Sequence, residues 1–178
     1  MEKLLLHVCC APCSSGVVED LKKEYDITVY FHNPNIDTYE EYEKRAKEVH
    51  KYMAILNLPY VIEKYKPRDY YKAIKGFEGE PEGGARCVEC FRLRLNKTFK
   101  YAKKHKFDIV STTLSVSPYK NVDVLNGLGT SLACKYNIPY LARDFKKNDG
   151  YLKSIQNSKK YDLYRQEYCG CKFSKKVR

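Results

Sequence analysis

The chain has 178 residues, 43% of them hydrophobic, which excludes a disordered chain and suits a single domain that folds without a disulfide scaffold. No apolar run approaches the ~20 residues of a membrane helix, and charged Glu2 and Lys3 lead into a strand-like run rather than a signal peptide. We therefore expect a cytoplasmic protein with no membrane partner. A net charge of +11, from 33 basic against 22 acidic residues, favours a nucleic-acid partner, although a lysine-rich solvated surface would give the same surplus.

Strand-like and helix-like segments alternate along the chain. In chain order, the sequence predicts a strand at residues 4–8, a helix at 14–24, a strand at 27–31, a helix at 38–56, a strand at 59–63, a short helix at 69–76, a loop at 77–85, a helix at 87–106, a strand at 108–113, a helix from 121 or 123, a strand at 139–143 and a helix from 151. Thr38 and Glu41 form a capping box at the start of the second helix.

This alternation requires right-handed crossovers and a parallel sheet covered on both faces. We therefore predict one doubly wound α/β domain over residues 1–178, with a mostly parallel sheet of about five strands. In such sheets, ligands bind beyond the carboxyl ends of the strands.

Seven of the eight cysteines fall in three tight groups. The groups are Cys9-Cys10-x-x-Cys13, Cys87-x-x-Cys90 and Cys169-x-Cys171. In a reducing compartment, clustered thiols indicate metal or redox chemistry rather than structural disulfides. Cys134 stands apart in a helical pattern, and we expect it to be a small buried hydrophobe.

The first group follows the first strand and is therefore expected at the ligand-binding edge of the sheet. Cys87 opens a helix that leads into the fourth strand, and we expect helix direction to place it at the opposite edge unless the loop at 77–85 returns it to the cleft. Convergence of the groups is inferred from their shared chemistry and not from the topology.

Two Cys-x-x-Cys groups supply four or five soft ligands, which suit either structural zinc or an iron–sulfur cluster. A closed zinc site uses four cysteines, so three of the seven need another role. In Cys169-Gly170-Cys171, the glycine permits the turn that a small strained disulfide or a metal chelate requires. A strained disulfide is typical of a redox-active pair.

Polar residues after the predicted fourth strand are further candidates. Tyr119 and Lys120 could donate protons or hold a phosphate, and Ser117 and Asn121 could contact RNA. The structural alternative is a turn at Pro118 followed by a helix cap at Asn121.

Two arginines and several other polar residues complete the candidate set. Arg94 and Arg165 are expected to contact RNA phosphates. We interpret His7 and His50 as structural, whereas His32 ends a strand at the cleft edge and keeps a possible functional role. Asp144 follows the fifth strand and could ligate iron, but we favour a solvated loop position for it.

From residue 3 to about 174, the order of these motifs resembles the QueH family of epoxyqueuosine reductases. The resemblance is carried by His7-Val8-Cys9-Cys10-Ala11-Pro12-Cys13-Ser14, by Arg86-Cys87-x-x-Cys90-Phe91-x-x-Arg94-Leu95, by residues 112–121 and by Tyr164-Arg165-Gln166-x-Tyr168-Cys169-Gly170-Cys171. It implies an adenine-nucleotide-hydrolase-like, Rossmann-like fold and a 4Fe–4S cluster without cobalamin. It also implies that tRNAs for Asp, Asn, His and Tyr are the substrates of the last step of queuosine formation, which needs an electron donor that the sequence does not identify.

Reduction of an epoxide to an alkene needs two electrons and two protons, and the oxygen leaves as water. A 4Fe–4S cluster delivers electrons singly, and a further iron or a dithiol can hold the epoxide oxygen. We assign the cluster to Cys9, Cys10, Cys87 and Cys90. The other clustered cysteines are left for an adjacent mononuclear iron or a redox-active Cys169–Cys171 pair, namely Cys13, Cys169 and Cys171.

A second partition also fits the sequence. Cys9 and Cys10 are adjacent in an extended segment and would point to opposite sides, so that each could serve a different centre. In either partition, we expect the C-terminal tail, at about residues 162–178, to fold back on the site.

Two other functions compete with a reductase. A zinc-stabilised tRNA-binding module explains the charge but leaves Cys169 and Cys171 without a role. An ATP-dependent tRNA sulfur-transfer enzyme would share the fold but needs a flexible phosphate loop after the first strand, where this chain has cysteines and Pro12.

Overall fold

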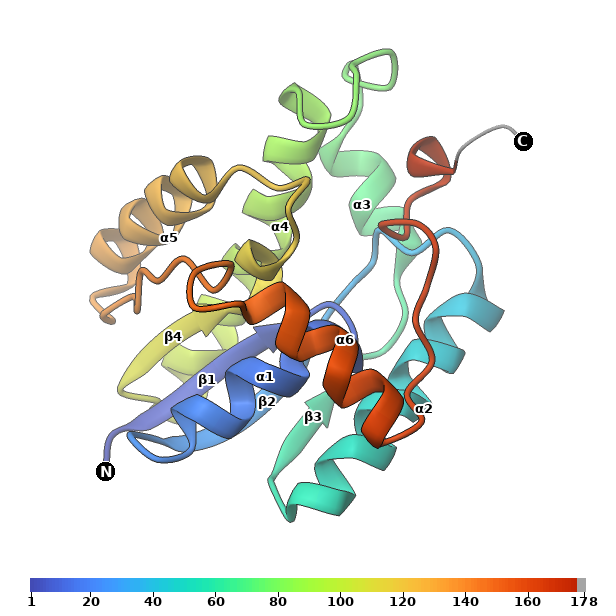
Figure 1. Ribbon diagram of the computed structural model, residues 1–178. Helices are drawn as coiled ribbons and strands as arrows, with labels where there is room; N and C mark the ends of the chain where they lie inside the picture. The colour runs from blue at the N-terminus through green and yellow to red at the C-terminus, as the bar shows by residue number, and fades with distance from the viewer. Residues whose placement is uncertain (176–178) are drawn as a thin grey trace.

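The computed structural model describes residues 1–175. Strands and helices alternate along the chain as the sequence predicts (Figure 1). The elements are β1 (Lys3–Val8), α1 (Ala11–Leu21), β2 (Asp26–Phe31), α2 (Tyr39–Leu56), β3 (Tyr60–Ile62), α3 (Pro67–Ala73), α4 (Ala85–His105), β4 (Ile109–Thr112), η1 (Thr113–Val116), α5 (Val122–Tyr136), α6 (Gly150–Lys160) and η2 (Lys172–Ser174).

The sheet has four described strands in the order β3-β2-β1-β4, and every pair is parallel. The prediction of about five strands is corrected here, because residues 139–143 form only one isolated bridge, between Val110 and Tyr140. Beyond this bridge, the Leu141 carbonyl accepts a hydrogen bond from the Ser111 hydroxyl at 2.9 Å.

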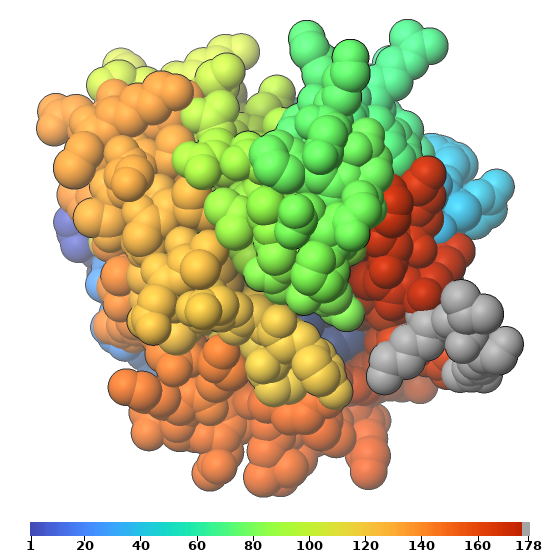
Figure 2. All heavy atoms as spheres, turned by 90° about the horizontal axis from the view of Figure 1, so that it is seen from above, coloured from blue at the N-terminus to red at the C-terminus, as the bar shows by residue number. Residues whose placement is uncertain are grey.

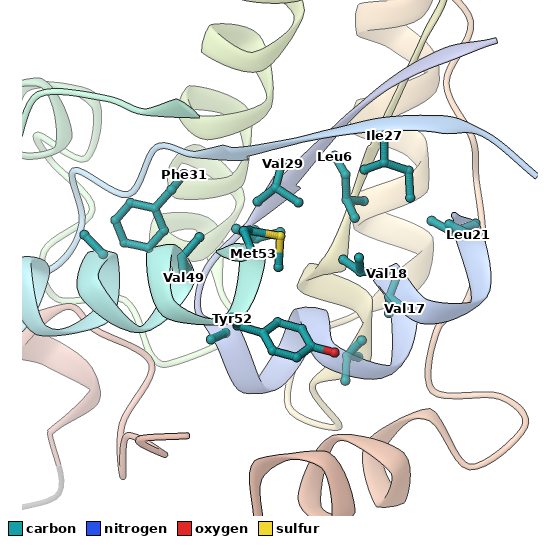
Figure 3. Close-up of a cluster of buried hydrophobic side chains, with 14 of the residues drawn as sticks. Leu6, Val17, Val18, Leu21, Ile27, Val29, Phe31, Val49, Tyr52 and Met53 are labelled. Carbon is teal, nitrogen blue, oxygen red and sulfur yellow. The ribbon is translucent and has the colours of Figure 1, made fainter. Parts of the chain in front are cut away.

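Side chains of β1 alternate between two hydrophobic clusters, one on each face of the sheet. Leu4 and Leu6 pack with β2, α1 and α2, whereas Leu5 packs with α4 and α5. Figure 3 shows the first cluster, in which side chains of α1 such as Val18 face those of α2 such as Met53. Both faces of β1 are therefore covered by hydrophobic side chains, as expected of a doubly wound sheet.

Two glycines lie at close approaches around α6. A Cβ on Gly150, the first residue of α6, would lie 1.7 Å from the Phe145 carbonyl oxygen. A Cβ on Gly16 in α1 would lie 3.1 Å from the Cβ of Lys153. Helices α1 and α6 approach closely at Gly16, whereas Gly150 lets the loop at Phe145 turn closely into α6, which leads directly into the C-terminal tail (Figure 1).

The strand order reverses between β1 and β4, so the carboxyl ends of these two strands mark the switch point where doubly wound sheets bind ligands. The prediction that helix direction places Cys87 at the opposite edge is wrong. A crossover helix runs antiparallel to the strands that it connects, so the beginning of α4 lies at their carboxyl edge. Cys87 lies in the first turn of that helix.

Three local predictions can also be checked. The Thr38 side chain caps α2 by accepting a hydrogen bond from the Glu41 amide at 3.2 Å, as predicted. The first helix begins at Ala11 and not at residue 14, because Cys10 is its N-cap and Pro12 suits its first turn. Cys134 is exposed and not buried, since the apolar stripe of α5 runs through Leu125, Leu128, Gly129 and Leu132.

No helix within residues 1–175 is both long and apolar enough to cross a membrane.

Candidate metal centre

The first thiol group lies at the end of β1 and in the first turn of α1. The Sγ atoms of Cys9, Cys10 and Cys13 all lie within 4.8 Å of one another, a spacing at which they could hold one metal ion. We call these three residues the strand group. The prediction that Cys9 and Cys10 point to opposite sides is wrong, because the chain turns into the helix at Cys10 and their Sγ atoms are 3.8 Å apart.

Within the strand group, negative charge concentrates on Cys9. Hydrogen bonds from the thiols of Cys10 and Cys13, with the nearby charges of Lys120 and Arg94, hold the pKa of Cys9 well below its ordinary value. Burial raises the pKa of Cys10 to about 12, and hydrogen bonding with the other two thiols raises that of Cys13. These surroundings favour the thiolate form at Cys9 and the thiol form at Cys10 and Cys13, and all three sulfur atoms are soft ligands for a metal.

The second thiol group joins α4 to the C-terminal tail. Cys87, Cys90, Cys169 and Cys171 line one cavity of about 30 Å³, and we call them the pocket group. Burial raises the pKa of Cys87, and raises that of Cys90 to about 12. This grouping differs from the predicted partition, because Cys87 and Cys90 share their cavity with the two tail cysteines.

The tail is held in this position by the beginning of α2. Arg45, which is 1% exposed, donates hydrogen bonds to the carbonyl oxygens of Cys169 at 2.9 Å and Tyr168 at 3.1 Å. The guanidinium also pairs with Glu41 at 2.6 Å. The Asp37 amide donates to the carbonyl of the intervening glycine at 2.9 Å. Residues 176–178 of the predicted tail lie outside the described residues.

Gly170 is required at the bend between the two tail cysteines. Its φ of +136° is one that residues with a side chain rarely adopt. A Cβ there would also lie 3.2 Å from the side chains of Arg45, Asn35 and Ile36. The glycine therefore lets the tail lie close to α2 while both neighbouring thiols line the cavity.

Arg94 lies beneath both thiol groups and not on the surface. Its side chain is 1% exposed and donates to Asn33 Oδ1 at 2.7 Å and to Cys90 Sγ at 3.8 Å. The prediction that Arg94 contacts an RNA phosphate is therefore corrected. The residue lies on the buried stripe of α4, one turn after Cys90, and its guanidinium points toward the sulfur atoms.

Lys120 and Tyr119 lie between the two groups. Both residues line the small cavity and also an open pocket of about 210 Å³, whose wall includes Cys9, Cys13 and Cys169. Burial opposes the charge of Lys120, but nearby Cys169, Cys9 and Cys13 raise its pKa overall. The Tyr119 ring is 80% exposed and therefore open to a ligand.

Ser117 and Asn121 have the geometry of a turn followed by a cap. Ser117 Oγ accepts from the Tyr119 amide at 3.3 Å, and Asn121 Oδ1 accepts from the amides of Asp123 at 2.9 Å and Val124 at 3.2 Å. Each residue nonetheless reaches a pocket, Ser117 the open pocket and Asn121 the small cavity. Their side chains therefore shape the site through the backbone of the turn.

Arg165 lies on the far wall of the open pocket. Its guanidinium donates to the hydroxyls of Ser154 at 3.4 Å and Ser158 at 3.2 Å, and it lies 5.8 Å from the Tyr151 ring centroid. Figure 2 looks onto this side of the molecule. It shows a hollow between the green, yellow-to-orange and red parts of the chain, with the blue N-terminal segment at its base.

The histidines do not reach the thiol pockets. His7 is fully buried and bonds the Thr112 hydroxyl at 2.9 Å and the His32 carbonyl at 3.1 Å, in keeping with a structural role. Burial lowers the pKa of both His7 and His32 to about 3. Asp144 Oδ1 accepts from the Lys146 amide at 3.0 Å, and the residue lines a different pocket from those that hold the thiols.

Three residues at the site were missed by the sequence prediction. Asn33 links Arg94 to the Val8 carbonyl, which lies just before the strand group. Asn35 lines the small cavity, and Arg45 holds the tail. The sequence did contain signals for them. The two asparagines follow the carboxyl end of a strand, and the arginine lies on the apolar stripe of a helix.

Comparisons with known proteins identify the family of this chain. The family model described as epoxyqueuosine reductase QueH matches residues 4–177. Three proteins named Epoxyqueuosine reductase QueH are similar to this chain. The one from Streptococcus pyogenes is 41% identical over 98% of this chain and 71% of its own length. The one from Staphylococcus epidermidis is 42% identical over 97% and 76%, and that from Thermotoga maritima is 34% identical over 98% and 91%.

Solved structures confirm the Rossmann-like α/β fold. The U34-tRNA thiolase NcsA from Methanococcus maripaludis, solved with its 4Fe-4S cluster, has a TM-score of 0.59 at 11% identity and covers 97% of this chain and 61% of its own. A predicted subunit of a tRNA methyltransferase from Methanocaldococcus jannaschii has a TM-score of 0.54 at 16% identity, covering 89% and 75%. These likenesses show the fold alone. The family model and the relatives show that the chain belongs to the QueH family of epoxyqueuosine reductases.

Proposed function

We propose that this protein is an oxidoreductase that converts epoxyqueuosine, at the wobble position of tRNA, to queuosine. The epoxide becomes an alkene, two electrons and two protons are consumed, and the oxygen leaves as water. One observation carries the proposal: in a chain of the QueH family, seven cysteines from three distant segments converge on the switch point of the sheet.

The residues at this edge fit an iron–sulfur cofactor. Seven thiols exceed the four of a closed zinc site. Two cations, Arg94 and Lys120, lie among the thiols, and within residues 1–175 neither forms an ion pair with a carboxylate. An anionic, thiolate-bound centre would balance these buried charges.

We assign a 4Fe–4S cluster to the pocket group and an adjacent mononuclear iron to the strand group. No cobalamin is required. When bound, these groups would supply low-potential electrons one at a time and a Lewis acid for the epoxide oxygen. An alternative for Cys169 and Cys171, which are free thiols here, is a disulfide that forms during turnover.

The open pocket would receive the modified base. Lys120, whose pKa is raised, would be protonated at neutral pH and could donate one of the two protons toward an oxygen bound there. Water that enters the pocket could supply the second. The exposed ring of Tyr119 could stack against the base at the entrance.

The positive charge of the chain supports binding of the tRNA backbone. Arg165, at the rim of the open pocket, is our candidate for a phosphate contact. The proposed substrates are the tRNAs for Asp, Asn, His and Tyr that carry epoxyqueuosine, and a low-potential protein or small-molecule donor would supply the electrons.

The test is anaerobic purification followed by iron, zinc and acid-labile sulfide analysis, with a turnover assay on epoxyqueuosine-containing tRNA. We expect more than four irons per chain, about four sulfides, and conversion of the epoxide in the presence of dithionite. A colourless protein with stoichiometric zinc, no sulfide and no conversion would contradict the proposal in favour of a zinc-stabilised RNA-binding module.

A further inference from the structure

Arg94 is held rigidly between the two thiol groups. Its Nη2 donates to Asn33 Oδ1 at 2.7 Å, and Asn33 Nδ2 in turn donates to the Val8 carbonyl at 2.9 Å, directly before Cys9. Its Nη1 lies 3.8 Å from Cys90 Sγ. The guanidinium therefore contacts the pocket group directly and is tied through one amide to the start of the strand group.

The charge of Arg94 has no anionic partner among the described side chains other than thiols. Its ordered neighbours within hydrogen-bonding distance are an amide oxygen and a sulfur, and its Nε has no partner. Two other arginines are buried: Arg45 is neutralised by Glu41 at 2.6 Å, and Arg86 donates to the backbone carbonyls of Glu78 and Glu80 rather than to a sulfur. A fully buried cation without a counter-ion is strongly unfavourable, so the site is built for an anion at the sulfur atoms.

We propose that Arg94 is the fixed counter-charge of the metal centre and makes its reduction potential more positive. This inference rests on the proposed function. Arg94 would act through the thiolates rather than on the substrate, and is therefore a positioning residue. One-electron reduction adds a negative charge to the thiolate-bound centre, and a buried cation nearby stabilises the reduced form more than the oxidised form.

The buried position makes this effect specific. The electrostatic effect of an exposed charge on the centre is screened by water and salt, whereas the effect of a buried charge is screened much less. Arg92 offers the matched comparison, because it lies on the same helix with 51% of its side chain exposed and pairs with Glu89. Removing either arginine changes the net charge by one.

The experiment is a dithionite titration of the anaerobic holoprotein, monitored by absorbance and electron paramagnetic resonance. At an ambient potential equal to the wild-type midpoint, we expect the ratio of reduced to oxidised centre in Arg94→Gln to fall at least tenfold, or about 59 mV for a one-electron couple. Arg94→Lys, which keeps the charge, should titrate close to the wild type, and so should Arg92→Gln.

A second variant covers the case in which Arg94→Gln fails to fold or load. Asn33→Asp leaves Arg94 in place and puts a carboxylate at the position that now lies 2.7 Å from its guanidinium. Neutralising the cation in this way should shift the midpoint in the same negative direction.

The outcomes separate the inference from the proposed function. A wild-type protein without iron and sulfide would overturn the proposed function and this inference together. Normal iron and sulfide content in Arg94→Gln or Asn33→Asp, with a midpoint within the spread of the wild type and Arg92→Gln, would overturn the inference alone. A shift in Arg94→Lys as large as that in Arg94→Gln would also overturn it, because the charge would not be the cause.

Discussion

The two thiol groups are built in different ways. The strand group comes from one short segment, Cys9 to Cys13, positioned by the end of β1 and the first turn of α1. The pocket group joins α4 to a tail almost eighty residues later, and depends on Arg45 and Gly170 to keep the tail against α2. We therefore expect the strand group to keep its geometry when the tail is disturbed, and the pocket group to lose it.

The largest expected effect comes from breaking one group at a time. In Cys90→Ser we expect loss of the acid-labile sulfide and the brown colour, because the proposed cluster loses a ligand. In Cys13→Ser we expect normal sulfide and the loss of about one iron per chain, because the strand group would hold the adjacent iron. Both variants should lose turnover.

Iron, sulfide and visible absorbance measure this difference, and Cys134→Ser on the exposed face of α5 is the matched control. Equal loss of sulfide in Cys13→Ser and Cys90→Ser would show that the two groups hold a single cluster.

The next largest effect is expected from Arg45→Met. Removing the guanidinium leaves two tail carbonyls without a donor and Glu41 without its cation, and we expect a loss of about 3 kcal/mol in the free energy of unfolding. In the reduced, metal-free protein, Cys169 and Cys171 should alkylate faster, while the rates of the strand group stay unchanged.

Urea titration and mass spectrometry of alkylated peptides make these measurements. The control is Lys47→Met, on the same helix, whose side chain is 73% exposed and which should change the unfolding free energy by less than about 0.5 kcal/mol. Uniform acceleration of alkylation at all seven cysteines would contradict a role for Arg45 specific to the tail.

A smaller effect is expected from acid, because His32 is buried directly after β2. Burial lowers the pKa of His32 from 6.5 to about 3, so between these values the unfolded chain binds a proton that the folded chain does not. Stability is therefore retained above pH 6.5 and lost as the pH falls toward 3, by up to about 1.4 kcal/mol per pH unit.

We expect His32→Asn to unfold with a shallower dependence on pH between 6.5 and 4.5 than the wild type, as measured by urea titration at each pH. Parallel curves for the two proteins would show that His32 does not couple folding to pH.

The smallest effect concerns Arg165, which lines the open pocket. Arg165→Gln should weaken tRNA binding severalfold and lower the slope of log affinity against log salt by about one, because a single phosphate contact is lost. Fluorescence anisotropy over a range of salt concentrations measures both. Lys23→Gln, a substitution of an exposed residue just after α1, is the control, and equal effects from the two variants would remove Arg165 from the interface.

Much of the framework could be predicted from local patterns. The alternation of strands and helices, the N-cap at Thr38 and the position of the strand group after β1 all follow from periodicity and capping chemistry within short segments. The extent of the fifth strand could not, because a local pattern does not show that residues 139–143 meet β4 through only one bridge, between Val110 and Tyr140.

By itself, the sequence determined the α/β fold class, the motifs of the family and the three groups of clustered cysteines. Only the tertiary structure decided which thiols meet, that Arg45 anchors the tail, and that Arg94 faces the sulfur atoms and not an RNA phosphate. The physical reason is the distance along the chain over which each kind of interaction acts. Periodicity and capping act within a few residues, whereas these contacts depend on crossover direction and on packing between segments far apart in the chain.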